Sequence, residues 1–270
     1  MSSRLRAIAH DTVAISERGS YSTAAGEVSL ADAVARAVAG TRLHLPDEVL
    51  ALPEETSGPR IDVTAESTLE AARRLGGDVA ALNFASARNP GGGFLNGAQA
   101  QEESIARASA LYPCLRAAGG FYAHHRAHED LTYSDRVIHS PRVPVFRDDG
   151  GELLPRPYEV SFLTAAAPNR AAILRNQPER AEGVPVALLR RAIRVLHVAA
   201  AHGHRRLVLG AWGCGVFGND PAAVAEVFRI ALRDNRYFDH VVFAVLDRQK
   251  GAPTLAAFSG VFPRKASDLR

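Results

Sequence analysis

The sequence has few of the features that mark secreted, membrane-spanning or metal-stabilised proteins. It contains two cysteines, Cys114 and Cys214, and neither belongs to a CxxC motif or a cluster with metal-ligand spacing. We therefore expect a reduced, cytoplasmic protein. The N-terminal stretch MSSRLRAIAHDTVAISERG lacks an apolar run of signal-peptide length, and no segment approaches the roughly 20 apolar residues of a membrane span. Internal repeats and low-complexity tracts are also missing.

The remaining composition is that of an ordinary globular protein. Of the 270 residues, 47% are hydrophobic and 23% are charged, which suits one large domain or one domain with an extension. The formal net charge of +3 is compatible with an anionic ligand but does not identify one. We expect a monomer with no sequence-specific binding of nucleic acid.

The chain divides into two parts of different character. Residues 1–75 are predicted to be helical and rich in loops, with Ser67 and Glu70 forming a capping box before a helix that ends at Gly76. Beyond them, strands are expected at DVAALNFAS, RVIHSPRVPVF, YEVSFLTAAAP, RRLVLGAW and HVVFAVLD, and helices at QEESIARASALY, VPVALLRRAIRVLHVAAAHG, DPAAVAEVFRIALRDN and TLAAFSGVF. This alternation predicts an α/β layered domain with a largely parallel or mixed sheet.

Two glycine-rich loops each lie between an expected strand and an expected helix, where such sheets bind ligands. In GAWGCGVFGND, residues 210–220, the glycines allow positive φ and close approach of a ligand. The following helix would add free N–H groups, a combination that suits a diphosphate. A tight turn without a ligand explains one such loop equally well. The second loop, Gly91-Gly92-Gly93, favours a nucleotide-like ligand.

A dehydrogenase is an alternative, because GCGVFG also matches the dinucleotide fingerprint G-x-G-x-x-G, and Asp247 ends the next expected strand. The position of the motif disfavours it, since too little chain follows for a doubly wound domain. Asp247 also lies farther downstream than the usual spacing of about 20 residues. Cys214 lacks the flanking glycines of a nucleophile elbow, and HHRAH, residues 124–128, is better explained as a solvated surface than as a metal site.

Seven residues after the glycine triplet come Gln101-Glu102-Glu103, at the start of an expected helix. Adjacent helical residues point about 100° apart, so one glutamate can hold a ligand while the other does chemistry. Exposed acidic residues in a first helical turn are common, and they explain the pair without a ligand. The glycine loop favours the functional interpretation. A glutamate facing an anion in a confined site should have a raised pKa, protonate a leaving oxygen and then activate water.

These motifs together resemble those of the bacterial-type poly(ADP-ribose) glycohydrolases, whose catalytic domain is a macrodomain. The signature reads GGG, the spacer FLNGAQA, then QEE, and GAWGCGVFGN is similar to the diphosphate loop of that family. NFASARNPGGG, YSDRVIHSPRVPVFRDDGGELL and TAAAPN are also similar, so the resemblance covers roughly residues 60–265. It implies a three-layer α/β/α macrodomain-like mixed sheet at residues 76–270, with an N-terminal helical extension at residues 1–75 packed on it.

The resemblance also implies roles for single residues. Glu103 would be the catalytic acid, Glu102 would bind ribose hydroxyls with help from Gln101, and Phe217 would pack on the terminal ribose. The substrate contacts implied by the resemblance are the bare backbone of Gly91, Gly92 and Gly93, the side chains of Asn83 and Asn89 beside the ribose, and backbone groups of Gly213, Gly215, Val216, Gly218 and Asn219 at the diphosphate. Other macrodomains carry an asparagine about where Ser86 falls here, which is a departure from the pattern.

The expected activity is hydrolysis of the ribose–ribose O-glycosidic bond of poly(ADP-ribose), from the chain end and with release of ADP-ribose. No cofactor and no metal are implied, unlike in the magnesium-dependent ADP-ribosyl hydrolases. ADP-ribosylated proteins are possible further partners, and a role in the DNA damage response follows from the resemblance. Two alternatives stay open: a non-catalytic reader of ADP-ribose, and a hydrolase of another ADP-ribosyl linkage on a protein or nucleobase.

Overall fold

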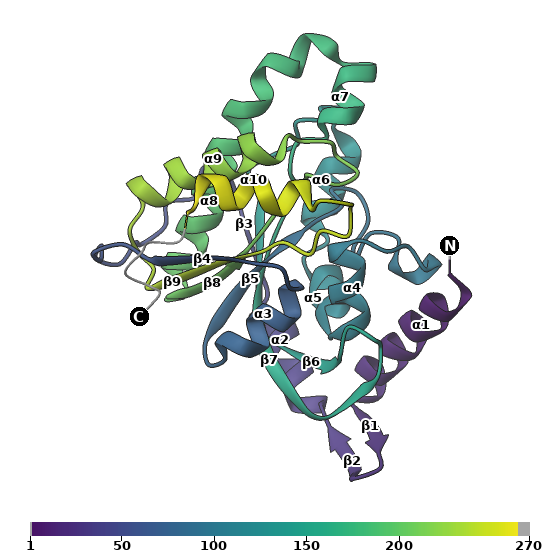
Figure 1. Ribbon diagram of the computed structural model, residues 1–270. Coiled ribbons are helices and arrows are strands. Elements are labelled where there is room, and N and C mark those ends of the chain that lie inside the picture. The colour runs from purple at the N-terminus through teal and green to yellow at the C-terminus, as the bar shows by residue number, and fades with distance from the viewer. Residues whose placement is uncertain (1, 264–270) are drawn as a thin grey trace. The chain divides into compact units, whose positions relative to one another are not determined.

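The computed structural model describes residues 2–263 (Figure 1). Helices and strands alternate along most of this length. In chain order the elements are α1 (Ser3–Arg18), β1 (Ser20–Thr23), β2 (Gly26–Ser29), α2 (Ala31–Gly40), β3 (Arg42–His44), β4 (Arg60–Thr64), α3 (Thr68–Leu75), β5 (Val79–Phe84), η1 (Phe94–Asn96), α4 (Gln101–Ala108), α5 (Leu111–Ala117), α6 (Gly120–Ala127), β6 (Val137–Arg147), β7 (Leu153–Ala165), α7 (Arg170–Asn176), η2 (Pro178–Gly183), α8 (Val184–Ala201), β8 (Arg206–Leu209), α9 (Pro221–Asp234), β9 (His240–Ala244) and α10 (Pro253–Val261).

Seven strands form one mixed sheet in the order β3-β6-β7-β5-β8-β9-β4, and β1 pairs with β2 in a separate hairpin. Strands β5, β8, β9 and β4 pair in parallel, whereas β6 pairs antiparallel with β3 and β7. Residues Val79–Leu82 of β5 are buried on both faces, as an apolar run in a parallel sheet requires. The predicted fold class, a mixed α/β sheet flanked by helices with an N-terminal helix, is confirmed.

The chain forms two compact units. The first comprises Met1–Leu45, Asn83–Glu129 and Arg136–Ala166, and the second comprises Pro46–Leu82, Asp130–Asp135 and Ala167–Arg270. Each unit combines segments that are distant in the sequence, because strands from different parts of the chain pair within it. The division at residue 75 that the sequence suggested stays a prediction. No helix within residues 2–263 has both the length and the apolar character needed to cross a membrane.

In the first unit, α1 lies alongside α4 and η1 (Figure 1). Ala9 of α1, Phe94 of η1 and Ala106 of α4 are fully buried against one another. A hydrogen bond fixes the same contact, because the hydroxyl of Thr12 donates to the carbonyl oxygen of Arg107 at 2.6 Å. The N-terminal helix therefore packs directly on the helix that begins with the glutamate pair.

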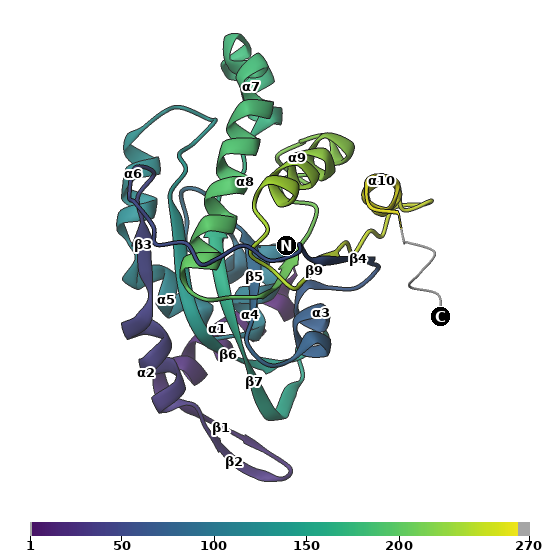
Figure 2. The ribbon, with the colours of Figure 1, turned by 90° about the vertical axis from the view of Figure 1, so that its left-hand side faces the viewer.

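In the second unit, α9 packs between α8 and α10, as Figure 2 shows. The core beneath these helices is aromatic. The ring of Phe228 on α9 lies 6.2 Å from Trp212 and 5.6 Å from Phe243 of β9, and Phe243 lies 5.4 Å from Phe258 of α10, all between ring centroids. This core joins β9, α9 and α10 to Trp212 in the loop at residues 210–220.

The helical prediction for the N-terminal part is right for α1, α2 and α3 but misses four strands. The hairpin β1–β2 and the short strands β3 and β4 occupy stretches expected to be loops. β3 pairs with β6 and β4 with β9, and each partner lies at least 90 residues away. A three- or five-residue edge strand has too little local pattern to be recognised, because distant backbone groups hold it in place.

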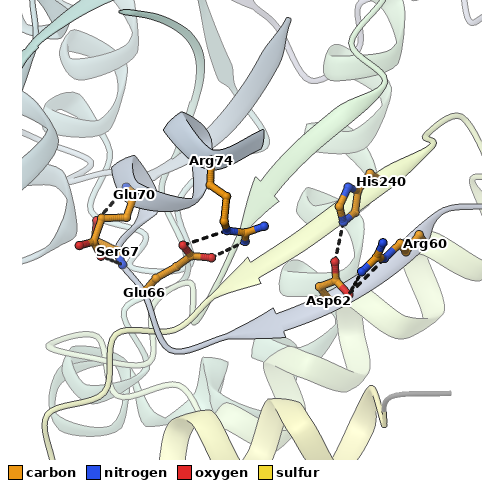
Figure 3. A network of polar contacts seen from close by, with 7 residues as sticks. All are labelled: Arg60, Asp62, Glu66, Ser67, Glu70, Arg74 and His240. Carbon is orange, nitrogen blue, oxygen red and sulfur yellow. Dashed lines mark hydrogen bonds and ion pairs between the residues drawn. The ribbon is translucent and has the colours of Figure 1, made fainter. Parts of the chain in front are cut away.

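Polar contacts support β4 at the edge of the sheet (Figure 3). The Asp62 carboxylate accepts a hydrogen bond of 2.7 Å from Nε2 of His240 on β9 and one of 3.2 Å from Arg60.

The predicted capping box at α3 is confirmed: Ser67 Oγ accepts from the Glu70 amide at 3.0 Å, and the Ser67 amide donates to Glu70 Oε2 at 2.9 Å. The amides of Ser67 and Glu70 at the start of α3 thereby both have hydrogen-bond acceptors.

We predict that Ser67→Ala lowers the free energy of unfolding by about 1 kcal/mol, because the amide of Glu70 loses its acceptor. Ser67→Asp supplies another capping oxygen and should stay close to the wild type. Urea unfolding followed by circular dichroism measures both variants. Equal midpoints for wild type and Ser67→Ala would contradict the assigned cap.

Candidate active site

The Gln101-Glu102-Glu103 stretch forms the first turn of α4. The N-cap residue, Ala100, has no side chain that could accept hydrogen bonds from the free amides of this turn. Glu102 and Glu103 lie in the same turn, where the helix dipole favours negative charge. Glu102 is 3% exposed and Glu103 is half-buried. The neighbouring carboxylates therefore meet different surroundings, as the helical geometry predicts.

The Glu102 carboxylate is held inside the first unit. Its Oε2 accepts a hydrogen bond of 2.7 Å from the amide of Ser86, and its Oε1 accepts one of 3.3 Å from the side-chain nitrogen of Asn83. The pKa of Glu102 is raised to about 8, mainly by burial and also by the charge of Glu103, while these hydrogen bonds lower it. The raised pKa expected for a glutamate of this pair thus belongs to Glu102, which is largely protonated at neutral pH.

The glycine triplet receives both carboxylates. Oε1 of Glu103 accepts a hydrogen bond of 3.0 Å from the amide of Gly93. Gly91 and Gly92 have φ values of +69° and +59°, in the left-handed region that favours glycine. A Cβ at Gly92 would overlap Oε1 of Glu103 and lie 3.1 Å from Oε2 of Glu102. The bare backbone therefore permits the approach of the glutamate pair itself.

Arg107, one turn after Glu103, secures the loop that connects the triplet to α4. Its guanidinium donates to the carbonyl oxygen of Ala98 at 2.5 Å and to Oγ of Ser104 at 3.2 Å. Burial lowers the pKa of Arg107, and the negative charge of Glu103 partly offsets this effect. Arg107 was not among the residues predicted from the sequence. Its spacing of four residues from Glu103 was the available signal.

Two side chains predicted to contact the ligand, those of Gln101 and Asn83, form hydrogen bonds with protein groups of the first unit. Oε1 of Gln101 accepts a hydrogen bond of 2.8 Å from the amide of Phe84, which ties the start of α4 to the end of β5. Asn83 is fully buried and donates to Thr164 at 3.2 Å as well as to Glu102. Asn89 is exposed, and its carbonyl oxygen accepts from the amide of Gly92 at 3.0 Å. Their contacts with a ribose stay predictions.

Ser86 and Tyr122 are further residues near the glutamates that the sequence patterns did not assign to them. Ser86 departs from the macrodomain pattern in its side chain, yet its backbone amide is the shortest contact of Glu102. Tyr122 of α6 is fully buried, and burial together with the charge of Glu102 raises its pKa well above the usual value. No local pattern links Tyr122 to Glu102, because they meet only through packing.

In the second unit, the loop at residues 210–220 packs against residues 167–171. Gly213 and Gly218 have φ values of +73° and +65°. A Cβ at Gly213 would come within 2.6 Å of Ala167, and a Cβ at Gly218 within 3.1 Å of Ala171. The buried side chain of Asn219 donates to the carbonyl oxygen of Pro168 at 2.9 Å, which locks the end of the loop.

The middle of this loop presents bare backbone. A Cβ at Gly215 would meet no atom within 4 Å. Among residues 2–263, no acceptor pairs with the amides of Gly215, Val216 and Phe217, so three successive N–H groups are available to an anion. The predicted contribution of the next helix stays a prediction. Asp220, the predicted N-cap, accepts from the amide of Ala223 at 2.8 Å, so this N–H group of α9 is already paired.

Three side chains of this loop differ in exposure. Val216 is 85% exposed, and Phe217 is half-buried rather than part of the core. Cys214 is half-buried, and burial, with a smaller effect of the nearby Asp220, raises the pKa of its thiol to about 12. A thiol with that pKa is a poor nucleophile, which agrees with the absence of a nucleophile elbow.

The residues that suggested a dehydrogenase or a metal site are engaged in contacts that stabilise the fold. The carboxylate of Asp247 accepts from the amides of Gln249 and Thr254 at 2.9 and 2.7 Å, so it fixes the approach to α10. His124 and His128 stack at 3.9 Å, but His125 is buried against Phe121, so the expectation of a fully solvated histidine cluster is wrong for His125. Within residues 2–263, no group of three or more His, Cys, Asp or Glu side chains could hold a metal ion.

Residues 9–148 match the sequence profile of the family described as "Microbial-type PARG, catalytic domain". A comparison with curated protein sequences found no match. The chain is 53% identical to poly(ADP-ribose) glycohydrolase (PARG) from Thermomonospora curvata, whose crystal structure it matches with a TM-score of 0.91 over 97% of this chain and 100% of that chain.

Two ligand-bound structures are also similar. The Thermomonospora curvata enzyme bound to the inhibitor ADP-HPD is 55% identical, with a TM-score of 0.89 over 96% of this chain and 99% of that chain. PARG from Deinococcus radiodurans in complex with ADP-ribose is 46% identical, with a TM-score of 0.79 over 85% of this chain and 97% of that chain. On this evidence, the chain belongs to the microbial-type poly(ADP-ribose) glycohydrolase family.

Proposed function

We propose that this poly(ADP-ribose) glycohydrolase cleaves the ribose–ribose O-glycosidic bond from the chain end, with Glu103 as acid and base, and releases ADP-ribose. The observation that carries the proposal is the docking of the Glu103 carboxylate on the amide of Gly93, 3.0 Å away. This contact supports Glu103 as the acid and base, because it fixes a half-buried carboxylate against the glycine triplet, which has no side chains. The complex of the Deinococcus radiodurans enzyme with ADP-ribose supports the choice of ligand.

The reaction needs one carboxyl group that acts first in its protonated state and then in its ionised state. Protonated Glu103 donates its proton to the 2′-oxygen of the leaving ribose as the glycosidic bond breaks, and the terminal ribose becomes oxocarbenium-like. The Glu103 carboxylate then takes a proton from water as the water oxygen bonds to the anomeric carbon. The products are ADP-ribose and a chain shortened by one unit, and Glu103 is again protonated.

Glu102 has a different role in this proposal, because its environment differs. With a pKa of about 8, its carboxyl group can donate one hydrogen bond to a ribose hydroxyl and accept another. A neutral Glu102 also places no second full negative charge beside Glu103. The buried contacts with Ser86 and Asn83 hold its orientation. We therefore assign Glu102 to ribose binding.

The loop of the second unit suits the diphosphate. The amides of Gly215, Val216 and Phe217 have no acceptor among the described residues, and successive N–H groups of this kind bind phosphate oxygens. The half-buried ring of Phe217 offers an apolar face for a ribose. These features support the predicted contacts of Gly215, Val216 and Phe217 with the ligand, whereas the amides of Gly218 and Asn219 donate to carbonyl oxygens of Gly215 and Gly213.

We predict that Glu103→Asn lowers kcat on poly(ADP-ribose) by at least about 100-fold, because the variant cannot transfer a proton. ADP-ribose binding should be retained, since the diphosphate contacts are elsewhere. Chromatography of the reaction products measures turnover, and calorimetry measures the dissociation constant of ADP-ribose.

The matched control is Glu226→Gln, which removes an exposed glutamate paired with Arg229 on α9 and should leave turnover unchanged. Normal cleavage by Glu103→Asn would refute its role. Wild type that binds ADP-ribose but releases none from the polymer would indicate a reader instead. Accumulation of oligomers as the first products would refute cleavage from the chain end.

We predict that Glu102→Gln gains stability over the wild type as the pH rises. The folded protein keeps a proton on Glu102 up to a pKa of about 8, whereas the unfolded chain loses it near the ordinary glutamate pKa of 4.5. Between these values the folded state binds more protons, so wild-type stability falls as pH increases, by up to about 1.4 kcal/mol per pH unit. Glutamine does not titrate and avoids this loss.

Urea unfolding at pH 5.5 and pH 8.5 tests this prediction on both proteins. Glu226→Gln is again the control, because the hydrogen bond with Arg229 lowers rather than raises the pKa of Glu226. A constant difference between Glu102→Gln and wild type at both pH values would show that Glu102 is ionised throughout.

Several expectations drawn from the sequence and from the resemblance stay predictions. These are the action on ADP-ribosylated proteins or other ADP-ribosyl linkages, the independence from metal ions, the monomeric state, the cytoplasmic location and the role in the DNA damage response. The rival of an NAD-dependent dehydrogenase is excluded by the family membership.

A further inference from the structure

One aromatic residue near the diphosphate loop has an unusual backbone. Among residues 2–263, three residues other than glycine have a positive φ, and Tyr133, at +60°, is the aromatic one. The left-handed region is a genuine outlier for a bulky side chain. Such strain persists only where the surrounding structure imposes it, and it gathers at functional sites. The contacts of Tyr133 therefore indicate what the strain supports.

The chain is tied down just before Tyr133. The amide of Tyr133 donates to the carbonyl oxygen of Asp130 at 3.1 Å. Oδ1 of Asp130 accepts from the amide and the hydroxyl of Thr132 at 2.8 and 2.7 Å, and its Oδ2 accepts from Arg180 at 2.7 Å. A tight turn with a fixed carboxylate thus leads into the strained residue.

The chain is tied down again just after Tyr133. The buried carboxylate of Asp135 accepts from Nε of Arg191 at 3.1 Å and also from Arg190, both on α8. The Arg191 side chain is fully buried, so breaking this ion pair would cost a large amount of free energy. With anchors on both sides, the direction of the Tyr133 side chain is imposed by the fold of the second unit.

The imposed direction points the Tyr133 ring at Phe217. The two ring centroids lie 6.1 Å apart with an interplanar angle of 47°, within the range of favourable aromatic pairs. Both residues are half-buried. Phe217 lies between the exposed Val216 and Gly218, and a glycine has no side chain to pack on the ring.

We propose that Tyr133 is a positioning residue, whose ring holds Phe217 in the orientation that packs on the terminal ribose. The proposal rests on the proposed function, because it uses the contact of Phe217 with that ribose. A ring that is free to rotate would hold the ribose less firmly, and small misplacements of substrate cost much of the rate. The strained backbone of Tyr133 is then the means of bringing a rigid aromatic group to a glycine-rich loop.

A double-mutant cycle tests this inference. Tyr133→Gly removes the ring and relieves the strained φ, so the fold should be retained. We expect it to lower kcat/KM on poly(ADP-ribose) about 10-fold and to raise the dissociation constant of ADP-ribose several-fold. Tyr133→Phe keeps the ring and should stay within about 2-fold of the wild type. Combined with Phe217→Ala, Tyr133→Gly should add little further loss, because it acts through Phe217.

Arg142→Gly is the matched control, since Arg142 of β6 has a φ of +46° and no assigned role. It should relieve a similar strain without changing kcat/KM or ADP-ribose binding. Full activity of Tyr133→Gly would overturn the inference, and so would losses that multiply in the double variant. The cycle can also be measured on ADP-ribose binding alone. A wild type that binds ADP-ribose but releases none would therefore refute the proposed function while still testing Tyr133.

Discussion

The approach of two adjacent carboxylates to a stretch of bare backbone is the contact on which the proposed chemistry depends. Glu103 takes a hydrogen bond from the amide of Gly93, and both glutamates approach the position where any side chain at Gly92 would begin. Glycine is needed there for conformation as well as for space, since Gly92 has a positive φ. Arg107 and the packing of α1 on α4 stabilise the loop and helix on which this contact is built.

Burial separates the roles of the two glutamates. Glu102 is nearly inaccessible and has a pKa of about 8, whereas Glu103 keeps part of its surface open. Two ionised carboxylates so close together would repel each other, and protonation of the buried one removes that repulsion. The pair can therefore combine a hydrogen-bonding group for ribose with a group that transfers a proton.

In the second unit, a side-chain hydrogen bond holds the end of the loop at residues 210–220 in place. The amides of Gly215, Val216 and Phe217, unpaired among the described residues, belong to this loop, whose end is held by Asn219, and Asp220 caps the amide of Ala223 on α9. Loop amides hold an oxyanion without any charged side chain, which suits a product that must leave after each turnover. The Tyr133–Phe217 pair extends this rigid surface by an apolar group.

Patterns among neighbouring residues predict the mixed α/β class, the caps at Ser67 and Asp220, both glycine loops and the glutamate pair, because each depends on residues that are close in the chain. The edge strands β3 and β4 depend on tertiary contacts, because they form only by pairing with distant strands. Tertiary contacts also bury Glu102, engage Asn83 and Gln101 with protein groups, and bring Arg107 to the loop before α4 and Tyr133 to Phe217. Burial and long-range contact set these properties, and a local sequence pattern does not show which distant residues meet.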